Sequence, residues 1–154
     1  MKEKTRIIIE HYNRKAISMK IYVSGSIYGG TQKIDTYKIL IEELEKYGEV
    51  LDKQIVDPNT IENEKYQSNE DIFKSLEKQL MMADILFAEV SIPSLGVGYE
   101  LGFADKIGKK IIAIYDENYT KKVSTMIRGN KRIKLIPYKN IEDITKNLEK
   151  LLRN

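Results

Sequence analysis

Cysteine and tryptophan are absent from the sequence, and histidine occurs once, as His11. Without cysteine the chain has no disulfide, no thiolate metal ligand and no cysteine nucleophile. One histidine cannot build a metal cage alone, and we interpret His11 as a solvated residue of the N-terminal segment. The sequence therefore predicts no metal site.

Long apolar runs are also missing. Nothing approaches the roughly 18 to 20 apolar residues that cross a bilayer, and the first residues lack the apolar core of a signal peptide. We expect a cytoplasmic protein with no membrane contact. Its 154 residues, 42% hydrophobic and 32% charged, fit one soluble domain with its own core.

An excess of positive charge is confined to the N-terminus. The formal net charge is +3, and residues 1–18 hold five Lys and Arg against two Asp and Glu, so the rest of the chain carries 21 of each sign. Nucleic-acid binding needs a concentrated basic face, which a neutral body does not supply. We expect a small-molecule partner, with residues 1–18 as an N-terminal extension to a domain over residues 19–154.

From Met19 onward, short β-branched runs alternate with segments of helical spacing. The apolar run "ILFAEV" is typical of a strand buried on both faces. Ser68 is a candidate N-cap, with Asp71 three residues later. The pattern predicts an α/β fold, a five-stranded parallel sheet with helices on both faces. The expected strands are 20–25, 49–55, 85–90, 110–116 and 132–138, the expected helices are 33–48, 68–84, 97–108 and 140–154, with a loop at 56–70 and a short helix or turn in 121–130.

Ligands of such sheets bind beyond the carboxyl ends of the strands, where the loops leading into helices gather. The first of these loops, "SGSIYGGTQ", contains three glycines ahead of a helix. Glycine lets backbone N–H groups approach an anion, and a helix N-terminus adds partial positive charge. The loop matches neither a Walker sequence nor the dinucleotide fingerprint. Phosphate binding and an ordinary tight turn both remain open.

The stretch "PSLGVGYELGFAD" places one carboxylate, Glu100, among glycines and apolar residues. We expect Glu100 in the first turns of a helix that begins around Val97, where the helix dipole favours the ionised form. A capping box would need a polar residue at Val97, which weakens a purely structural explanation. An ionised carboxylate in a small pocket suits attack on an anomeric carbon, although general-base chemistry is equally compatible with the pattern.

The segments "KIYVSGSIYGG", "AEVSIPSLGVGYELG" and "VSTMIRG", in this order, resemble the 2′-deoxynucleoside 5′-monophosphate N-glycosidases of the nucleoside deoxyribosyltransferase superfamily. The likeness runs from Met19 to the C-terminus. It implies a Rossmann-like fold and a cofactor-independent homodimeric hydrolase. Such an enzyme cleaves the N-glycosidic bond of a deoxynucleoside 5′-monophosphate to free base and deoxyribose 5-phosphate through a covalent glycosyl-enzyme.

The resemblance also implies roles for individual residues. Glu100 is the nucleophile at C1′, and Tyr22 lies beside the sugar and this carboxylate. Ser124 and Met126 reach into the neighbouring subunit's site. The remaining implied substrate contacts are Gly25, Ser26, Ile27, Tyr28, Gly29 and Gly30 around the 5′-phosphate, Ser94, Gly96 and Gly98 along the sugar and phosphate, and Tyr37 near the nucleotide. Core packing of Tyr22 and Tyr37, interface packing of Met126 and N-capping by Ser124 are the structural alternatives.

Two departures from the family pattern leave other functions open. Tyr28 replaces an arginine, and a phenol offers phosphate one hydrogen bond where a guanidinium offers two. Phe73 and Leu76 occupy the positions of a family His and Asp, and Leu76 cannot transfer a proton. Weaker phosphate recognition would suit a nucleoside 2-deoxyribosyltransferase, and loss of the acid would suit a catalytically impaired nucleotide-binding module.

Overall fold

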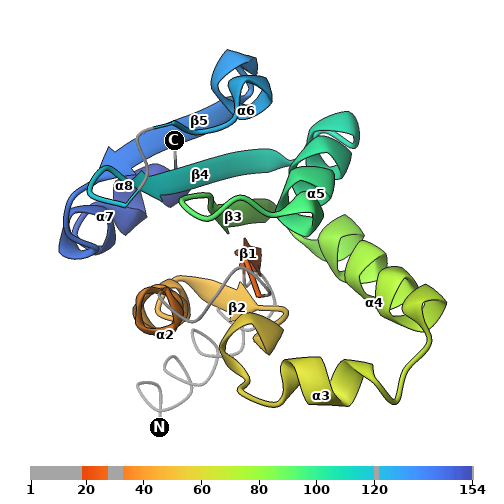
Figure 1. The fold of residues 1–154 in the computed structure, drawn as a ribbon. Helices are drawn as coiled ribbons and strands as arrows, with labels where there is room; N and C mark the ends of the chain where they lie inside the picture. The colour runs from red at the N-terminus through yellow and green to blue at the C-terminus, as the bar shows by residue number, and fades with distance from the viewer. Residues whose placement is uncertain (1–18, 28–32, 120–121, 154) are drawn as a thin grey trace, which may run out of the picture.

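Five parallel strands form one sheet, with helices in the connections (Figure 1). The structure is a computed structural model that describes residues 19–27, 33–119 and 122–153. The strands are β1 (Met19–Ser24), β2 (Gly48–Val50), β3 (Ile85–Glu89), β4 (Lys110–Asp116) and β5 (Ile133–Tyr138). The helices are α2 (Ile34–Leu44), η1 (Gln54–Val56), α3 (Thr60–Glu64), α4 (Asn69–Met82), α5 (Leu95–Lys106), α6 (Thr125–Gly129), α7 (Glu142–Thr145) and α8 (Leu148–Arg153).

The order of the strands across the sheet is β2-β1-β3-β4-β5. The chain therefore moves outward from β1 to β2 and then returns past β1 to β3. Ile21 pairs with Val50 on one side and with Ile85 on the other. The reversal between β1 and β3 is the point at which open parallel sheets bind their ligands.

Each face of the sheet is covered by its own hydrophobic core. Alternating side chains of the strands point to opposite faces, so residues two apart share a core. Helices α2, α7 and α8 pack on the face of Ile21, Val23 and Phe87, whereas α4 and α5 pack on the face of Tyr22 and Leu86 (Figure 1). The predicted fold class, a five-stranded parallel sheet with helices on both faces, is confirmed.

Several element bounds differ from the predictions. Strand β2 ends at Val50, because Asp52 accepts the Gln54 N–H at 2.8 Å and turns the chain into η1. The predicted loop at 56–70 contains α3. The single C-terminal helix is two helices, since the Asn147 side chain donates to the Asp143 carbonyl at 2.9 Å where α7 ends.

Two predicted helix ends agree with the structure. Ser68 caps α4, its hydroxyl accepting the Asp71 N–H at 3.0 Å. Gly108 follows α5 at φ +74°, where the Lys109 N–H bonds the Ala104 carbonyl at 2.9 Å and closes the helix. Over the described ranges, no helix combines the length and apolar character that spanning a bilayer requires. Residues 1–18 lie outside those ranges, so their separation from the domain stays a prediction.

Candidate active site

Glu100 lies on α5 with both carboxylate oxygens occupied by hydroxyl donors. The Tyr22 hydroxyl donates to Oε1 at 2.8 Å, and the Ser24 hydroxyl donates to Oε2. Tyr22 and Ser24 are two residues apart on β1, so both point to the face that α5 covers. Tyr22 is 3% exposed and Ser24 is also buried, and both are fixed by the sheet. The carboxylate therefore has a defined orientation at the carboxyl end of β1.

The charge of Glu100 is set by burial and by these hydroxyls. Burial raises the pKa of Glu100, the hydrogen bonds from Ser24 and Tyr22 lower it, and the charge of Asp52 raises it, with a net upward shift. The predicted influence of the helix dipole needs correction. Helix α5 begins at Leu95 with Ser94 as its N-cap, so Glu100 lies in the second turn, beyond the strong field of the helix end.

The glycines around Glu100 are not required by the packing of this chain. A Cβ atom at Gly98 or Gly102 would meet no heavy atom within 4 Å, and one at Gly96 would meet only the Ser94 hydroxyl at 3.8 Å. Ser94 itself accepts the Val97 N–H at 3.4 Å as the helix cap. The bare surface of α5 therefore leaves room for a molecule beyond the described chain.

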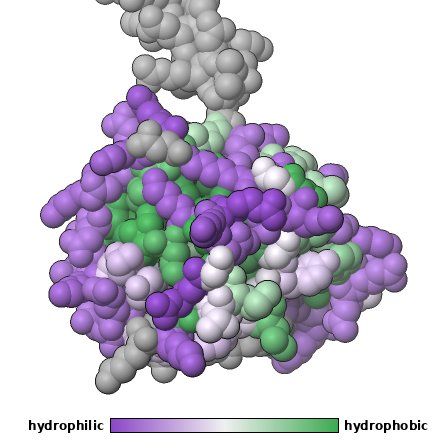
Figure 2. Space-filling view, turned by 90° about the horizontal axis from the view of Figure 1, so that it is seen from above, coloured by the Kyte–Doolittle hydropathy of each residue, from purple (hydrophilic) through white to green (hydrophobic). Residues whose placement is uncertain are grey.

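A groove of about 960 Å³ runs between α5 and α6. Its lining brings together four residues that the sequence assigned to substrate binding: Ser94, Gly98, Ser124 and Met126. Met126 is 82% exposed. Ser124 also caps α6, accepting the Met126 N–H at 3.3 Å, as the structural alternative predicted. Figure 2 shows hydrophobic areas between hydrophilic ones on the upper side of Figure 1, the side of α6 and β5.

The loop after β1 starts at Gly25, where the structure requires glycine. A Cβ atom there would lie 2.4 Å from Ile55 Cδ1 and 2.9 Å from Tyr37 Cζ. Tyr37 is 2% exposed, so its ring packs in the core beneath this loop. Burial raises the pKa of Tyr37, and the Ser26 backbone hydrogen bond lowers it. Ser26 is buried and Ile27 half-buried, whereas Tyr28, Gly29 and Gly30 lie outside the described residues.

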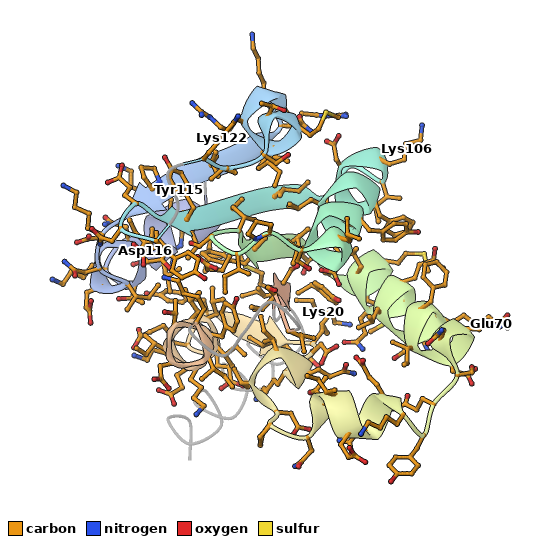
Figure 3. All side chains as sticks on the ribbon, in the orientation of Figure 1. Lys20, Glu70, Lys106, Tyr115, Asp116 and Lys122 are labelled. Carbon is orange, nitrogen blue, oxygen red and sulfur yellow. The ribbon has the colours of Figure 1, made fainter. Side chains whose placement is uncertain are left out.

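A second polar cluster lies at the carboxyl ends of β3, β4 and β5. Glu89 is 1% exposed and accepts hydrogen bonds from the Ser91 hydroxyl and, at 3.0 Å, from the Tyr138 hydroxyl. Lys33, 5% exposed, forms an ion pair with Asp116, which Figure 3 labels on β4. This cluster ties the start of α2 to the ends of three strands.

The seam between α4 and α5 is apolar at the two positions where the resemblance implies His and Asp. The Phe73 ring meets Tyr99 edge-on at 6.0 Å, and Tyr99 stacks on Phe103 at 6.3 Å. Leu76 packs against the core beneath α4 and α5. Neither position can exchange a proton, as the sequence predicted. Within the described ranges, no cluster of three or more His, Cys, Asp or Glu side chains could hold a metal ion.

The sequence analysis did not single out Ser24, Asp52 or Glu89 as site residues. Ser24 ends β1, Glu89 ends β3, and Asp52 follows β2 by two positions. Polar residues at the carboxyl ends of buried parallel strands are themselves a signal of a site, because these ends converge on one edge of the sheet. That signal points to Ser24 and Glu89, near the ends of predicted strands, whereas Asp52 lies inside the predicted strand 49–55 and escapes it.

Comparisons with known proteins find relatives over most of the domain. The sequence model described as nucleoside 2-deoxyribosyltransferase matches residues 21–145. A 5-hydroxymethyl-dUMP N-hydrolase of Esox lucius is 39% identical over 114 residues, 72% of this chain and 79% of that protein. A protein of the same name from Danio rerio is 38% identical over 112 residues, which cover 72% of this chain and 78% of that protein.

The fold is similar to that of a solved CMP N-glycosidase from Clostridium botulinum. The TM-score is 0.59 with 20% sequence identity, over 84% of this chain and 98% of that one. At this identity the likeness concerns the fold alone. The two proteins share the α/β architecture. In this chain, α5 and β1 of that architecture bring Glu100, Tyr22 and Ser24 together.

Proposed function

The chain belongs to the nucleoside 2-deoxyribosyltransferase family, and we propose that it hydrolyses the N-glycosidic bond of 2′-deoxynucleoside 5′-monophosphates. The products are the free base and 2-deoxyribose 5-phosphate. Relatives at 38% and 39% identity that carry the name 5-hydroxymethyl-dUMP N-hydrolase support an N-glycosidase. The observation that carries the proposal is the Glu100 carboxylate, held on both oxygens by Tyr22 and Ser24 at the edge of the sheet where ligands bind.

Glu100 is the nucleophile of this reaction. One carboxylate oxygen bonds to C1′ of the deoxyribose while the C1′–N bond breaks and its electron pair leaves with the base, which takes up a proton. Water then attacks C1′ of the glycosyl ester, loses a proton, and releases the Glu100 carboxylate. The hydroxyl donors of Tyr22 and Ser24 hold the carboxylate for attack, so the geometry is formed before substrate arrives.

The 5′-phosphate is bound by the loop between β1 and α2. Gly25 lets the start of the loop pack closely on Ile55 and Tyr37, and Ser26 adds a buried polar residue next to it. Ile27, Tyr28, Gly29 and Gly30 complete the phosphate contacts. Helix α2 begins at Ile34, and its N-terminal partial charge favours an anion at this position. The buried Tyr37 ring supports this loop from beneath and offers the nucleotide no exposed face.

A homodimer completes each site. Ser124 and Met126 project from α6 beside the groove, and Leu95 of α5 is 96% exposed on the same groove. Covering such exposed apolar side chains with a second protein surface is favourable, because it removes apolar area from water. In the dimer, Ser124 and Met126 of one subunit contact the nucleotide of the other, while Ser94, Gly96 and Gly98 face the sugar and phosphate.

Transfer of deoxyribose to a second base is the alternative reaction, because a base can intercept the same covalent intermediate. Tyr28 in place of arginine favours it, since weaker phosphate binding suits free nucleosides. A nucleotide-binding module with little turnover is the further alternative, favoured by Phe73 and Leu76 on α4.

Base release separates these functions. Purified protein is incubated with each deoxynucleoside and its 5′-monophosphate, with and without a second free base, and the products are separated by chromatography. The proposal predicts free base from monophosphates and no new nucleoside. Glu100→Gln should lower the rate by at least about 10³-fold, whereas Glu149→Gln on the exposed face of α8 should leave it unchanged. Nucleotide binding by calorimetry without base release would instead indicate the binding module.

A further inference from the structure

Asp52 is a second carboxylate beside the proposed nucleophile. It follows β2, the neighbour of β1, at the same edge of the sheet as Tyr22 and Ser24. The Leu51 N–H still bonds the Ile21 carbonyl at 3.0 Å, so β1 and this segment remain side by side up to Asp52. Asp52 interacts electrostatically with both Tyr22 and Glu100. Asp52 therefore lies at the end of the strand pair that also presents Tyr22 and Ser24 to Glu100.

The position of Asp52 is fixed by hydrogen bonds. Its Oδ1 accepts the Gln54 N–H at 2.8 Å, and the Lys53 backbone and the Gln79 side chain also donate to it. The Gln79 Oε1 atom is buried and, among the described residues, has no partner. A half-turn of this amide would present an acceptor to a protonated Asp52. Gln79 can thus serve both protonation states of the carboxyl.

The two carboxyls compete for a proton, because a charge on Asp52 raises the pKa of Glu100. The titratable groups facing Asp52 are Tyr22 from β1 and Glu100 from α5, and α4 supplies the neutral Gln79 amide. Two neighbouring carboxylates resist simultaneous ionisation. Two hydroxyls stabilise the charge on Glu100. Burial raises the pKa of Asp52, in opposition to its hydrogen bonds with Gln54, Lys53 and Gln79.

Among the described residues of α4, neither Leu76 nor Asp71 offers a comparable acid. Leu76 lies one turn before Gln79 on α4 and belongs to the apolar packing. Asp71 is exposed and accepts the Ser68 hydroxyl at 2.7 Å. Asp52 thus brings a carboxyl from β2 to the part of the site where α4 presents Leu76.

We propose that Asp52 is the proton donor and acceptor of the reaction, an assignment that rests on the proposed function. Protonated Asp52 gives its proton to the leaving base as the C1′–N bond breaks and the Glu100 oxygen bonds to C1′. The Asp52 carboxylate then takes a proton from the water that attacks C1′, and Glu100 leaves as a carboxylate. Both groups return to their starting states.

The test compares substrates whose bases do and do not need a proton. The base of 7-methyl-dGMP leaves as a neutral molecule without protonation, whereas the base of dGMP requires a proton. Asp52→Asn keeps the Oδ1 acceptor and removes the acid. It should slow dGMP hydrolysis by roughly 10²- to 10⁴-fold and leave 7-methyl-dGMP hydrolysis within a few-fold of wild type. The alkaline limb of the dGMP rate profile should also disappear.

The matched control is Asp57→Asn. Asp57 accepts the Asn59 N–H at the same 2.8 Å and in the same i to i+2 geometry, but it is exposed in the next turn. This variant should hydrolyse both substrates like wild type. Equal losses on the two substrates in Asp52→Asn would show that Asp52 only supports the fold, and would overturn the proposal.

A second measurement keeps the assignment separate from the proposed function. Carboxyl-carbon NMR of the whole protein follows the titration of Asp52, which should move to lower pH in Glu100→Gln because the neighbouring charge is removed. An unchanged Asp52 titration would overturn the pairing. Wild type that shows this coupling but releases no base from any deoxynucleotide would contradict the proposed function instead.

Discussion

Burial and two hydroxyl groups act on the Glu100 carboxylate in opposite directions. Burial raises its pKa, and hydrogen bonds from Ser24 and Tyr22 lower it without cancelling the effect. A nucleophile must be ionised, so activity is lost as the pH falls through this raised pKa. The acid limb of kcat/KM should therefore lie above the ordinary value of glutamate.

Tyr22→Phe tests the hydroxyl contribution at the residue scale. Loss of the 2.8 Å hydrogen bond to Glu100 removes one group that lowers the pKa of Glu100, so the acid limb should move to higher pH. A hydrogen bond to a charged group contributes about 1.5–3 kcal/mol, which predicts a rate roughly 10- to 100-fold lower. The pH dependence of kcat/KM measures both effects. Tyr115→Phe, at the half-buried end of β4, is the control, and equal behaviour of the two variants would contradict the assigned contact.

Among single residues, the local pattern of flanking glycines singled out Glu100, and the resemblance to a family singled out Tyr22. The structure places these two side chains in contact. Ser24 and Asp52 were missed because their relevance depends on pairing across 76 positions and on the adjacency of β1 and β2. Such contacts follow from strand order, which a single sequence does not specify.

At the scale of elements, the loop between β1 and α2 is held by close packing. Gly25→Ala should destabilise the protein by about 1–3 kcal/mol, because the new Cβ would overlap Ile55 Cδ1 and the Tyr37 ring. Ile55→Val removes the nearer of these atoms and should recover part of that loss in the double variant. Urea unfolding measures both. Gly98→Ala provides the contrast, since nothing lies within 4 Å and helix propensity should raise stability by about 0.5–1 kcal/mol.

The ion pair of Lys33 and Asp116 connects the start of α2 to the end of β4. Burial raises the pKa of Asp116, but Lys33 and the backbone N–H groups of Asn118 and Tyr119 outweigh it and lower the pKa overall. A lowered carboxyl pKa stabilises the fold above the unfolded value, and this contribution is lost as pH falls through the folded value.

Asp116→Asn should therefore be less stable than wild type at neutral pH, with the difference closing in acid. Lys33→Met should cost roughly 3 kcal/mol at neutral pH, because it leaves Asp116 without its partner. The free energy of unfolding measured from pH 3 to 8 tests both. A constant gap between Asp116→Asn and wild type across this range would contradict the assigned pair.

Element prediction was accurate for β1, β3, β4 and β5, and weaker for β2 and at helix ends. The continuous hydrophobic sequences of β3 and β4 predict strands that are buried on both faces. Helix α5 began two residues earlier than predicted, because Ser94 caps it across glycine-rich sequence that has low helix propensity. The Asn147 side chain and the Asp52 turn, which end α7 and β2, are local hydrogen bonds that periodicity does not reveal.

At the scale of the whole molecule, the reversal of strand order between β1 and β3 gathers the site. It places Ser24 at the end of β1 next to the loop that leads from β3 into α5. The groove between α5 and α6 extends from that loop to the exposed Met126. Helix α5, which carries Glu100 and also supplies Gly98 to the lining of this groove, therefore connects the proposed sugar site to the proposed dimer contact.

Met126→Glu tests the dimer. A charge in place of an exposed apolar side chain should shift the protein from dimer to monomer in sedimentation velocity and lower activity, while the unfolding of the monomer changes little. Tyr66→Glu is the control, because Tyr66 is equally exposed, at 82%, on the remote loop after α3. A wild type that sediments as a monomer at the concentrations of the assay would contradict a shared site.

The most direct test concerns the bond between Glu100 and the sugar. A 2′-fluoroarabinosyl nucleotide slows the breakdown of a glycosyl-enzyme, because fluorine destabilises the cationic transition state. After rapid quenching, mass spectrometry should show the protein heavier by one fluorinated sugar phosphate, with the modification on the peptide that contains Glu100. Release of base without any adduct, together with full activity in Glu100→Gln, would contradict the account.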